Sequence, residues 1–194
     1  NKQNQYLTPI MADEGGNNNA SDYMGGDQEV PWDATHVRIH ESVKIITRYA
    51  FRNCRNLVSV EMHDGVEIIE EAAFADCGSL RGIKLPGVRV IEQSAFAAFG
   101  SCLEDVEFGN KLESIGDHAF QCCRLRNIKL PKCRVIGKSA FAGCLQLTDV
   151  ELSDEDLETI KLDAFYHCPR LRRLAIPLNT RMIRGNVFEV CDAL

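Results

Sequence analysis

From residue 37 to the end of the chain, apolar residues recur in a fixed order about every 23 residues. Each unit contains two apolar residues separated by a polar one, then a single isoleucine, and closes on a pattern close to Ala-Phe-x-x-Cys-x-x-Leu. The clearest markers of the unit are the phenylalanines Phe51, Phe74, Phe96, Phe120, Phe141, Phe165 and Phe188. A period of this length is typical of a solenoid, in which stacked turns share one continuous apolar core.

Each unit predicts two local structures. The paired apolar residues, such as Ile83 with Leu85, alternate with polar residues as in a half-buried strand. Proline ends several of these strands, because it cannot donate a ladder hydrogen bond; the prolines are Pro86, Pro131 and Pro177. The Ala-Phe-x-x-Cys portion spaces its apolar residues by three and four, which favours a short helix or a 3-10 turn. We therefore predict an α/β repeat.

The unit resembles the BspA-like leucine-rich repeat, which reads roughly as apolar-x-x-Ile-x-x-x-Ala-Phe-x-x-Cys-x-x-Leu-x-x-Ile-x-Leu-Pro. The resemblance covers about residues 35–194, with seven matching copies. It implies a right-handed solenoid with a parallel sheet on its concave face and short helices or 3-10 turns on its convex side. It also implies a noncatalytic role, since members of the family act in adhesion or protein–protein contact.

Two segments are predicted. Residues 1–33 form an acidic, Asn/Gly-rich tail and N-terminal cap, in which Trp32 is expected to cover the open end of the first turn. Residues 34–194 form the leucine-rich repeat solenoid. Its last repeat is incomplete, because the sequence reaches Leu194 before another strand. Open solenoid ends are capped or continued, so we expect either a longer chain or a partner subunit at this C-terminal end.

The nine cysteines are interpreted as mainly structural. Six occupy the cysteine position of the repeat: Cys54, Cys77, Cys123, Cys144, Cys168 and Cys191. Phe99 occupies that position in one repeat, so the position favours a buried apolar group. Disulfide bonds between adjacent turns are the alternative. Cys122 is expected to be the most exposed thiol. Unpaired thiols favour a reducing intracellular compartment, with the cell surface as the alternative.

Charge and motifs exclude several functions. The chain has a formal net charge of −6, and residues 1–33 hold one lysine against six acidic residues, so the solenoid is nearly neutral. A nearly neutral domain is a poor candidate for nucleic-acid binding. No run of eighteen apolar residues predicts a membrane span. His40 and His63 occupy the same position of neighbouring turns, but they lack a third ligand, so we predict no metal, no cofactor and no enzyme.

The candidate binding residues lie on the predicted sheet and near its C-terminal end. Between the paired buried residues, one side chain of each strand must point outward, and these side chains alternate in sign: Arg38, Glu61, Lys84, Glu107, Lys129 and Glu151. A second group is basic: Arg170, Arg172, Arg173, Arg181 and Arg184. We predict a mixed polar protein contact on the sheet. The arginines form either a docking patch for an acidic partner, for which residues 1–33 are one candidate, or a solvated face.

The sequence therefore predicts a noncatalytic scaffold that binds a protein partner, or a structural subunit of a larger assembly. The alternative is a cell-surface adhesion or recognition module for peptides or glycans.

Overall fold

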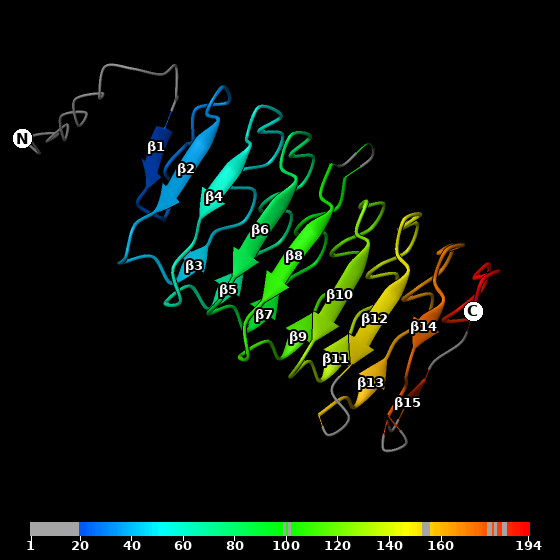
Figure 1. Ribbon diagram of the computed structural model, residues 1–194. Helices are drawn as coiled ribbons and strands as arrows, with labels where there is room; N and C mark the ends of the chain where they lie inside the picture. Colours follow the sequence, from blue (N-terminus) through cyan, green and yellow to red (C-terminus); the bar gives the residue numbers. More distant parts are fainter. Residues whose placement is uncertain are drawn as a thin grey trace, which may run out of the picture.

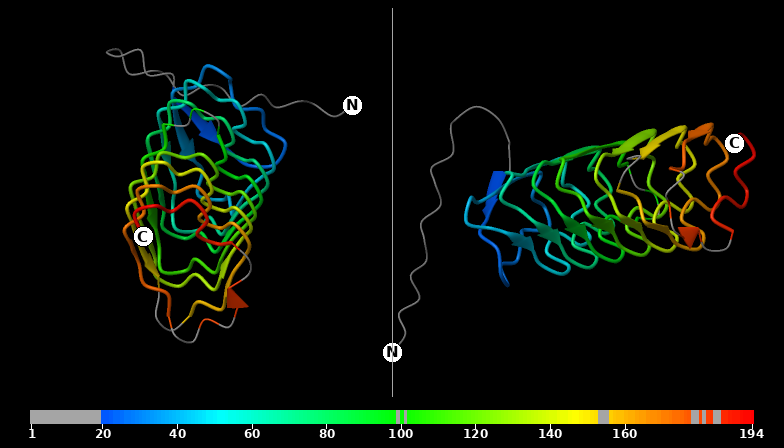
Figure 2. Two further views of the ribbon diagram at one scale, coloured as in Figure 1. Left: turned by 90° about the vertical axis from the view of Figure 1, so that its right-hand side faces the viewer. Right: turned by 90° about the horizontal axis from the view of Figure 1, so that it is seen from below.

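The computed structural model describes residues 20–98, 100, 102–152, 156–177, 180, 182–183 and 186–194. These residues form a solenoid, with β1 at one end and the C-terminus at the other (Figure 1). Each complete turn contributes one longer strand and one two-residue strand, joined by tight turns. Seen along and across the solenoid, the turns stack as similar loops around a common interior (Figure 2).

The longer strands lie side by side on one face, which we call the long-strand face. They are β1 (Ala20–Tyr23), β2 (His36–Ile39), β4 (Ser59–Glu61), β6 (Gly82–Leu85), β8 (Asp105–Phe108), β10 (Asn127–Leu130), β12 (Asp149–Leu152) and β14 (Arg173–Leu174). They pair in parallel in the groups β1-β2-β4, β6-β8 and β10-β12-β14. The predicted alternation is confirmed: in β6, Ile83 and Leu85 are buried and Lys84 is exposed.

The shorter strands form one seven-stranded parallel sheet, the short-strand sheet, in the order β15-β13-β11-β9-β7-β5-β3. Its members are β3 (Ile45–Ile46), β5 (Ile68–Ile69), β7 (Val90–Ile91), β9 (Ser114–Ile115), β11 (Val135–Ile136), β13 (Thr159–Ile160) and β15 (Met182–Ile183). The second residue of each strand is the isoleucine of the repeat. Ile69 pairs in register with Ile91, and both are fully buried.

The short helix predicted in each repeat is wrong for the residues that the structure describes. The segment instead contains single hydrogen-bonded tight turns, because neighbouring amides bond alternately within the repeat and to the next repeat. The Phe120 amide donates to the carbonyl of Ala140 in the next turn (2.8 Å), whereas the Gln121 amide donates locally to His118 (3.2 Å). Positive φ angles of 59° at His118 and 61° at Cys122 interrupt any helical run. The apolar spacing therefore reflects alternating tight turns and inter-turn bonds.

The core is organised by the stacked phenylalanines. Ring centroids of successive phenylalanines lie between 4.7 Å (Phe51 and Phe74) and 6.0 Å (Phe165 and Phe188), with planes nearly parallel. All of these rings except Phe188 are at most 2% exposed. This confirms the predicted continuous core, in which each turn packs its phenylalanine on that of the next turn as close-packed aromatic pairs do.

Tyr23 covers the N-terminal end of this stack, and the prediction for Trp32 is wrong. Trp32 is 77% exposed, whereas Tyr23 is fully buried, with its ring centroid 5.0 Å from that of Phe51. The Tyr23 hydroxyl lies 2.9 Å from the hydroxyl of Thr47. Because β1 pairs in parallel with β2, it directs Tyr23 over the first phenylalanine. Trp32 lies in the loop before β2 and does not reach this position.

Candidate functional site

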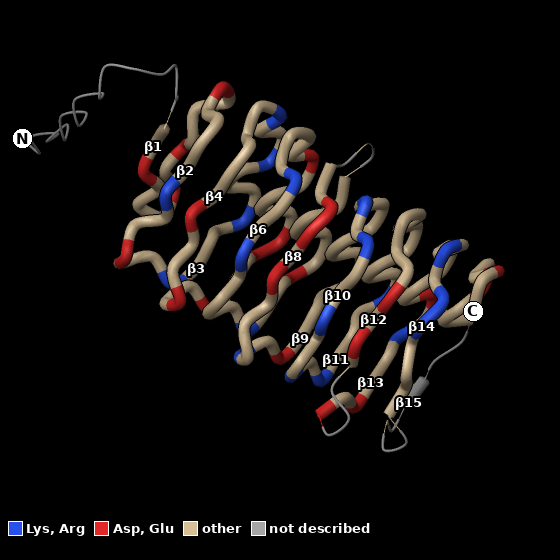
Figure 3. Tube along the Cα trace, in the orientation of Figure 1, with Lys and Arg blue, Asp and Glu red and all other residues tan. Residues whose placement is uncertain are grey.

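The six alternating charges predicted for the sheet form one exposed row on the long-strand face. Lys84 and Glu107 are register partners, as are Lys129 and Glu151, and both pairs form ion pairs, at 2.8 and 2.9 Å. Arg38 and Glu61 form a third ion pair at 3.2 Å. These six side chains are between 66% and 77% exposed. Blue and red therefore alternate from strand to strand along this face (Figure 3).

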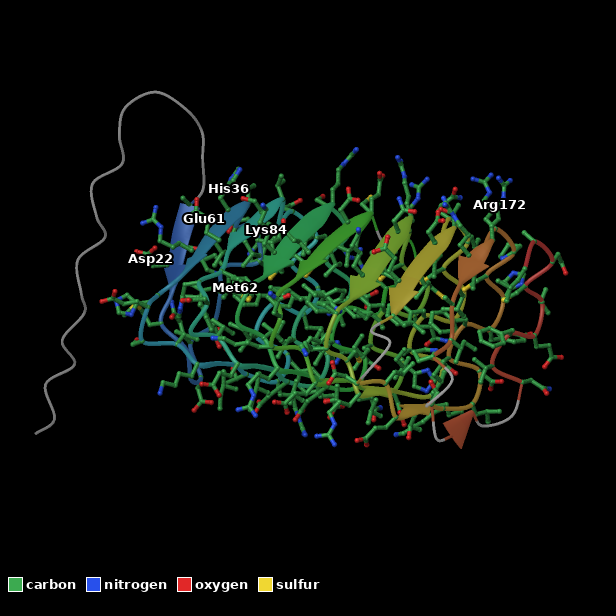
Figure 4. All side chains as sticks on the ribbon, turned by 60° about the horizontal axis from the view of Figure 1, so that its bottom comes forward. Asp22, His36, Glu61, Met62, Lys84 and Arg172 are labelled. Carbon is green, nitrogen blue, oxygen red and sulfur yellow. The ribbon has the colours of Figure 1, made fainter. Side chains whose placement is uncertain are left out.

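Asp22 adds one acidic member to the N-terminal end of this row, and sequence reasoning missed it. Asp22 lies in β1 and is the register partner of Arg38 in β2, and its Oδ1 lies 3.8 Å from Arg38 Nη1. Asp22, Glu61 and Lys84 lie along the outer side of the long strands (Figure 4). The signal in the sequence is Ser21-Asp22-Tyr23, in which a charge precedes a buried aromatic residue as in a strand. We call Asp22 together with the six predicted residues the long-strand row.

The pairs in this row are held by contact between exposed groups. Hydrogen bonding and the charge of Glu107 raise the pKa of the Lys84 ammonium. Beside the row, at the start of β12, the hydrogen bond from the Thr148 hydroxyl and the Arg173 guanidinium lower the pKa of the Asp149 carboxyl. Exposed pairs of this kind contribute roughly 0–1 kcal/mol each to stability. Each pair in the row therefore stabilises the fold only slightly.

A second row of alternating charges lies beside the short-strand sheet, two residues before each buried isoleucine. Its members are Lys44, Glu67, Arg89, Glu113, Arg134 and Glu158, and we call them the short-strand row. Arg89 pairs with Glu113 at 2.7 Å and Arg134 pairs with Glu158 at 2.6 Å. These hydrogen bonds and charges raise the pKa of both guanidinium groups. Comparing the residue two positions before the isoleucine of each repeat would have found this row from the sequence.

The predicted basic group is only partly described. Arg170, Arg172 and Arg173 are exposed near the C-terminal end, where Figure 4 labels Arg172. Arg170 Nη1 donates to Gln146 Oε1 at 2.5 Å, and Arg173 pairs with Asp149. Arg181 and Arg184 lie outside the described residues. Two of the three described arginines are therefore engaged with the preceding turn.

The histidine pair is a turn element. His63 Nε2 lies 3.0 Å from the carbonyl oxygen of His40, so this nitrogen carries the proton and donates. His63 Nδ1 then accepts from the Gly65 amide at 3.1 Å. His40 Nδ1 accepts from the Ser42 amide at 3.2 Å. Both ring nitrogens of His63 are thus used by the backbone, and the described residues contain no group of three His, Cys, Asp or Glu that could hold a metal ion.

A shallow groove of about 430 Å³ crosses the short-strand sheet over β7, β9 and β11. Gly116 adds no side chain there, and the Lys161 ammonium, which lines the groove, lies 3.2 Å from the carboxylate of Asp117. Burial alone would raise the pKa of Asp117, but the Lys138 amide and the Lys161 ammonium lower it. The three charged residues that line the groove already have partners within the chain: Lys161 pairs with Asp117, Glu71 with Arg48, and Glu92 accepts from the Glu71 amide. The long-strand row therefore remains the candidate surface.

The repeat signature extends over nearly the whole described chain. The family profile "BspA type Leucine rich repeat region" matches residues 32–132 and 97–194, in six copies. The chain belongs to this family. No curated protein sequence gives a significant match. The described residues contain no helix long and apolar enough to cross a membrane.

Solved structures of other leucine-rich repeat proteins share the fold. A protein from Eubacterium ventriosum is 23% identical, with a TM-score of 0.72 over 84% of this chain and 45% of its own. A leucine-rich repeat protein from T. pallidum is 28% identical, with a TM-score of 0.62 over 83% of this chain and 65% of its own. A "leucine rich cell surface protein" from Faecalibacterium prausnitzii is 26% identical, with a TM-score of 0.55 over 83% and 58%. The chain thus spans about half to two thirds of the length of these proteins.

The cysteine position of this BspA-type repeat bonds one turn to the previous turn in five of the repeats. The thiol of Cys77 donates to the carbonyl of Phe51 (3.1 Å), and that of Cys144 donates to the carbonyl of Phe120 (3.3 Å). Cys123, Cys168 and Cys191 make the equivalent bond. All nine cysteines are free. The cysteine position therefore holds a small buried group that also donates a hydrogen bond, which a purely apolar side chain could not do. Phe99, which occupies this position in the third repeat, lies outside the described residues.

We expect the buried thiols to be protected from alkylation in the native protein. Burial raises the pKa of Cys168 to about 12 and that of Cys144 well above its usual value, so little thiolate forms near neutral pH. Half-buried Cys122, Cys102 and Cys191 should react first. A time course with iodoacetamide, read by peptide mass spectrometry, checks this order. Early labelling of Cys144, or an intact mass that rises on adding reductant, would contradict it.

Proposed function

We propose that this chain is a noncatalytic leucine-rich repeat scaffold that binds a protein partner through its long-strand face and serves as a subunit of a larger assembly. The observation that carries the proposal is the long-strand row, a line of exposed charges that alternate in sign across the three groups of parallel long strands. The flanking positions of the strands are mostly small or polar: His36, Ser59, Gly82, Asp105, Asn127, Asp149 and Arg173. No catalytic residue is assigned.

The row favours a partner that presents mixed polar groups. Each charge already has a neighbour of opposite sign, so the face attracts neither a strongly acidic nor a strongly basic partner over long distances. It does offer many hydrogen-bonding groups at the spacing of parallel strands, about 4.8 Å. Such a surface suits a wet, hydrogen-bonded protein contact in which the match of charges selects the partner.

The basic C-terminal end provides a second contact for an acidic segment of the same partner. Arg170, Arg172 and Arg173 lie there, and the sequence adds Arg181 and Arg184. Among the described strands, β14 pairs on one side only, with β12. An added strand that brings carboxylates would pair with the open side of β14 and place acidic groups near Arg172.

Two variants with the same change in composition test the proposed face. The first carries Glu61→Ala, Lys84→Ala, Glu107→Ala and Lys129→Ala in the long-strand row. The control carries Glu67→Ala, Arg89→Ala, Glu113→Ala and Arg134→Ala in the short-strand row. Each variant removes two acidic and two basic side chains, so the net charge stays at −6. In quantitative affinity capture, we expect the first variant to lose the partners of the wild type and the control to keep them. Equal retention by both variants would contradict the proposal.

A cell-surface recognition module for peptides or glycans is the second candidate function. It is supported by the similarity to a solved structure that is called a leucine-rich cell surface protein. Labelling of intact cells with a membrane-impermeant reagent distinguishes the two functions, because only a surface module would be labelled before lysis. The free thiols favour the scaffold, since secreted proteins more often carry disulfides.

A further inference from the structure

The net charge of the solenoid changes sign from each turn to the next. We number the turns as residues 35–57, 58–80, 81–103, 104–125, 126–147, 148–171 and 172–194. Turn 2 holds six acidic residues and no basic one, whereas turn 5 holds five basic residues and no acidic one. Turns 1, 3, 5 and 7 are net basic, and turns 2, 4 and 6 are net acidic. Residues 20–34, which cover turn 1, hold four acidic residues and no basic one.

These charges meet across the boundaries between turns at several places around the perimeter. The long-strand row contributes pairs such as Lys84 with Glu107, and the short-strand row contributes Arg89 with Glu113. A third set lies at the start of the long strands, where Arg126 Nη2 is 2.8 Å from Glu104 Oε2 and Arg173 pairs with Asp149. Each turn therefore carries a net charge of one sign and is stacked against turns whose net charge has the opposite sign.

The apolar core does not distinguish one turn from the next, because equivalent core residues are the same in successive turns. The phenylalanines Phe51, Phe74, Phe120 and Phe141 are all at most 1% exposed and stack in the same way. The isoleucines Ile46, Ile69, Ile91 and Ile136 are all fully buried. A chain that skipped one turn would still stack phenylalanine on phenylalanine and isoleucine on isoleucine. It would, however, bring two turns of the same sign together.

We propose that the alternating sign of the turns acts as a stacking code, which selects the correct neighbour for each turn and disfavours structures that skip one turn. The individual pairs are exposed and weak, but they repeat at every boundary and act in the same direction. The correct stacking is then selected both by attraction between neighbouring turns of opposite net charge and by repulsion between turns of the same sign in a chain that skips one turn. Because the groups are at the surface, the code should weaken as salt is added.

A full-length variant that exchanges the signs of turns 3 and 4 separates the code from simple ion pairing. It carries Lys84→Glu, Arg89→Glu, Glu107→Lys and Glu113→Arg. The net charge and the pairs between positions 84 and 107 and between 89 and 113 are retained with reversed polarity. Like charges now meet at the boundaries between turns 2 and 3 and between turns 4 and 5. The control carries Lys84→Arg, Arg89→Lys, Glu107→Asp and Glu113→Asp, which keep every sign.

Urea denaturation at low and high salt gives the first readout. If the code operates, the folding equilibrium constant of the exchange variant falls about tenfold or more relative to wild type and control at low salt, as four weak attractions become repulsions. The difference should largely disappear at about 1 M salt, where the Debye length is about 3 Å. Equal midpoints at low salt would overturn the code. A loss that persists at high salt, or a variant that folds in neither buffer, would overturn it as well.

Amide hydrogen exchange on the same proteins locates the effect. The code predicts faster exchange at low salt for inter-turn amides at the two faulty boundaries, such as Glu92, which donates to Ile69, and Gly137, which donates to Ile115. The Gly116 amide, which donates to Ile91 across the boundary between turns 3 and 4, should exchange as in the wild type. Uniform acceleration along the solenoid would indicate general destabilisation and would contradict a code that acts at boundaries.

Discussion

Replacing Phe120 by alanine should lower the free energy of unfolding by about 3–5 kcal/mol. Phe120 is fully buried, and its ring stacks between Phe96 at 5.0 Å and Phe141 at 5.4 Å. It also meets Phe108 edge-on at 5.9 Å. Removing the ring would leave a cavity in the middle of the stack, where turns on both sides prevent collapse. Urea denaturation monitored by circular dichroism measures the loss.

Phe188→Ala provides the matched control for this prediction. Phe188 belongs to the same stack and lies 6.0 Å from Phe165, but it is only partly buried and lies in the last turn. Its loss should therefore cost clearly less than that of Phe120, since part of the ring already faces solvent. If both variants unfolded at the same urea concentration, the stack would not be the continuous core described above.

Replacing Gly87 by alanine should also be strongly destabilising, by about 1–3 kcal/mol. A Cβ atom at Gly87 would lie 1.9 Å from the carbonyl oxygen of Asp64 in the previous turn. The obstructing atoms belong to the backbone, so no change of rotamer can relieve the clash. The turns would have to separate near the end of β6, which would strain the stacking of the neighbouring turns.

Gly78→Ala is the control for this glycine, because a Cβ atom there would meet nothing within 4 Å. This change should alter the free energy of unfolding by no more than about 0.5 kcal/mol. Thermal and urea unfolding of the two variants can be compared directly. A neutral Gly87→Ala variant would mean that the turns do not approach each other as closely as described.

Much of this architecture could be predicted from single positions of the repeat. The alternation in Gly82–Leu85 predicts which side chains of β6 face the core, and the phenylalanine period predicts the stack. The helix was predicted wrongly because spacings of three and four fit both a helix and a pair of tight turns. Hydrogen bonds decide between them, and the Phe120 amide bonds to Ala140, which lies in the next turn. A pattern within one repeat cannot reveal that partner.

The missed features depend on comparing positions that were not chosen as markers. Tyr23 lies outside the phenylalanine period, yet parallel pairing of β1 with β2 directs it onto Phe51. The short-strand row lies two residues before each buried isoleucine, outside the strand alternation that predicts the outward residues of the longer strands. The donor role of cysteines such as Cys77 depends on a carbonyl in another turn. Each of these features needed the stacking geometry in addition to the period.

Carboxyl footprinting of the protein bound to its captured partner tests the proposed interaction most directly. Glu61, Glu107 and Glu151 belong to the long-strand row, whereas Glu67, Glu113 and Glu158 occupy the same turns in the short-strand row and serve as an internal control. Modification by a carbodiimide and an amine is read by peptide mass spectrometry, with and without the partner. We expect the partner to protect the first three carboxylates and to leave the other three unchanged. Protection of the short-strand row instead, or equal modification of both rows in the complex and in the free protein, would contradict binding through the long-strand face.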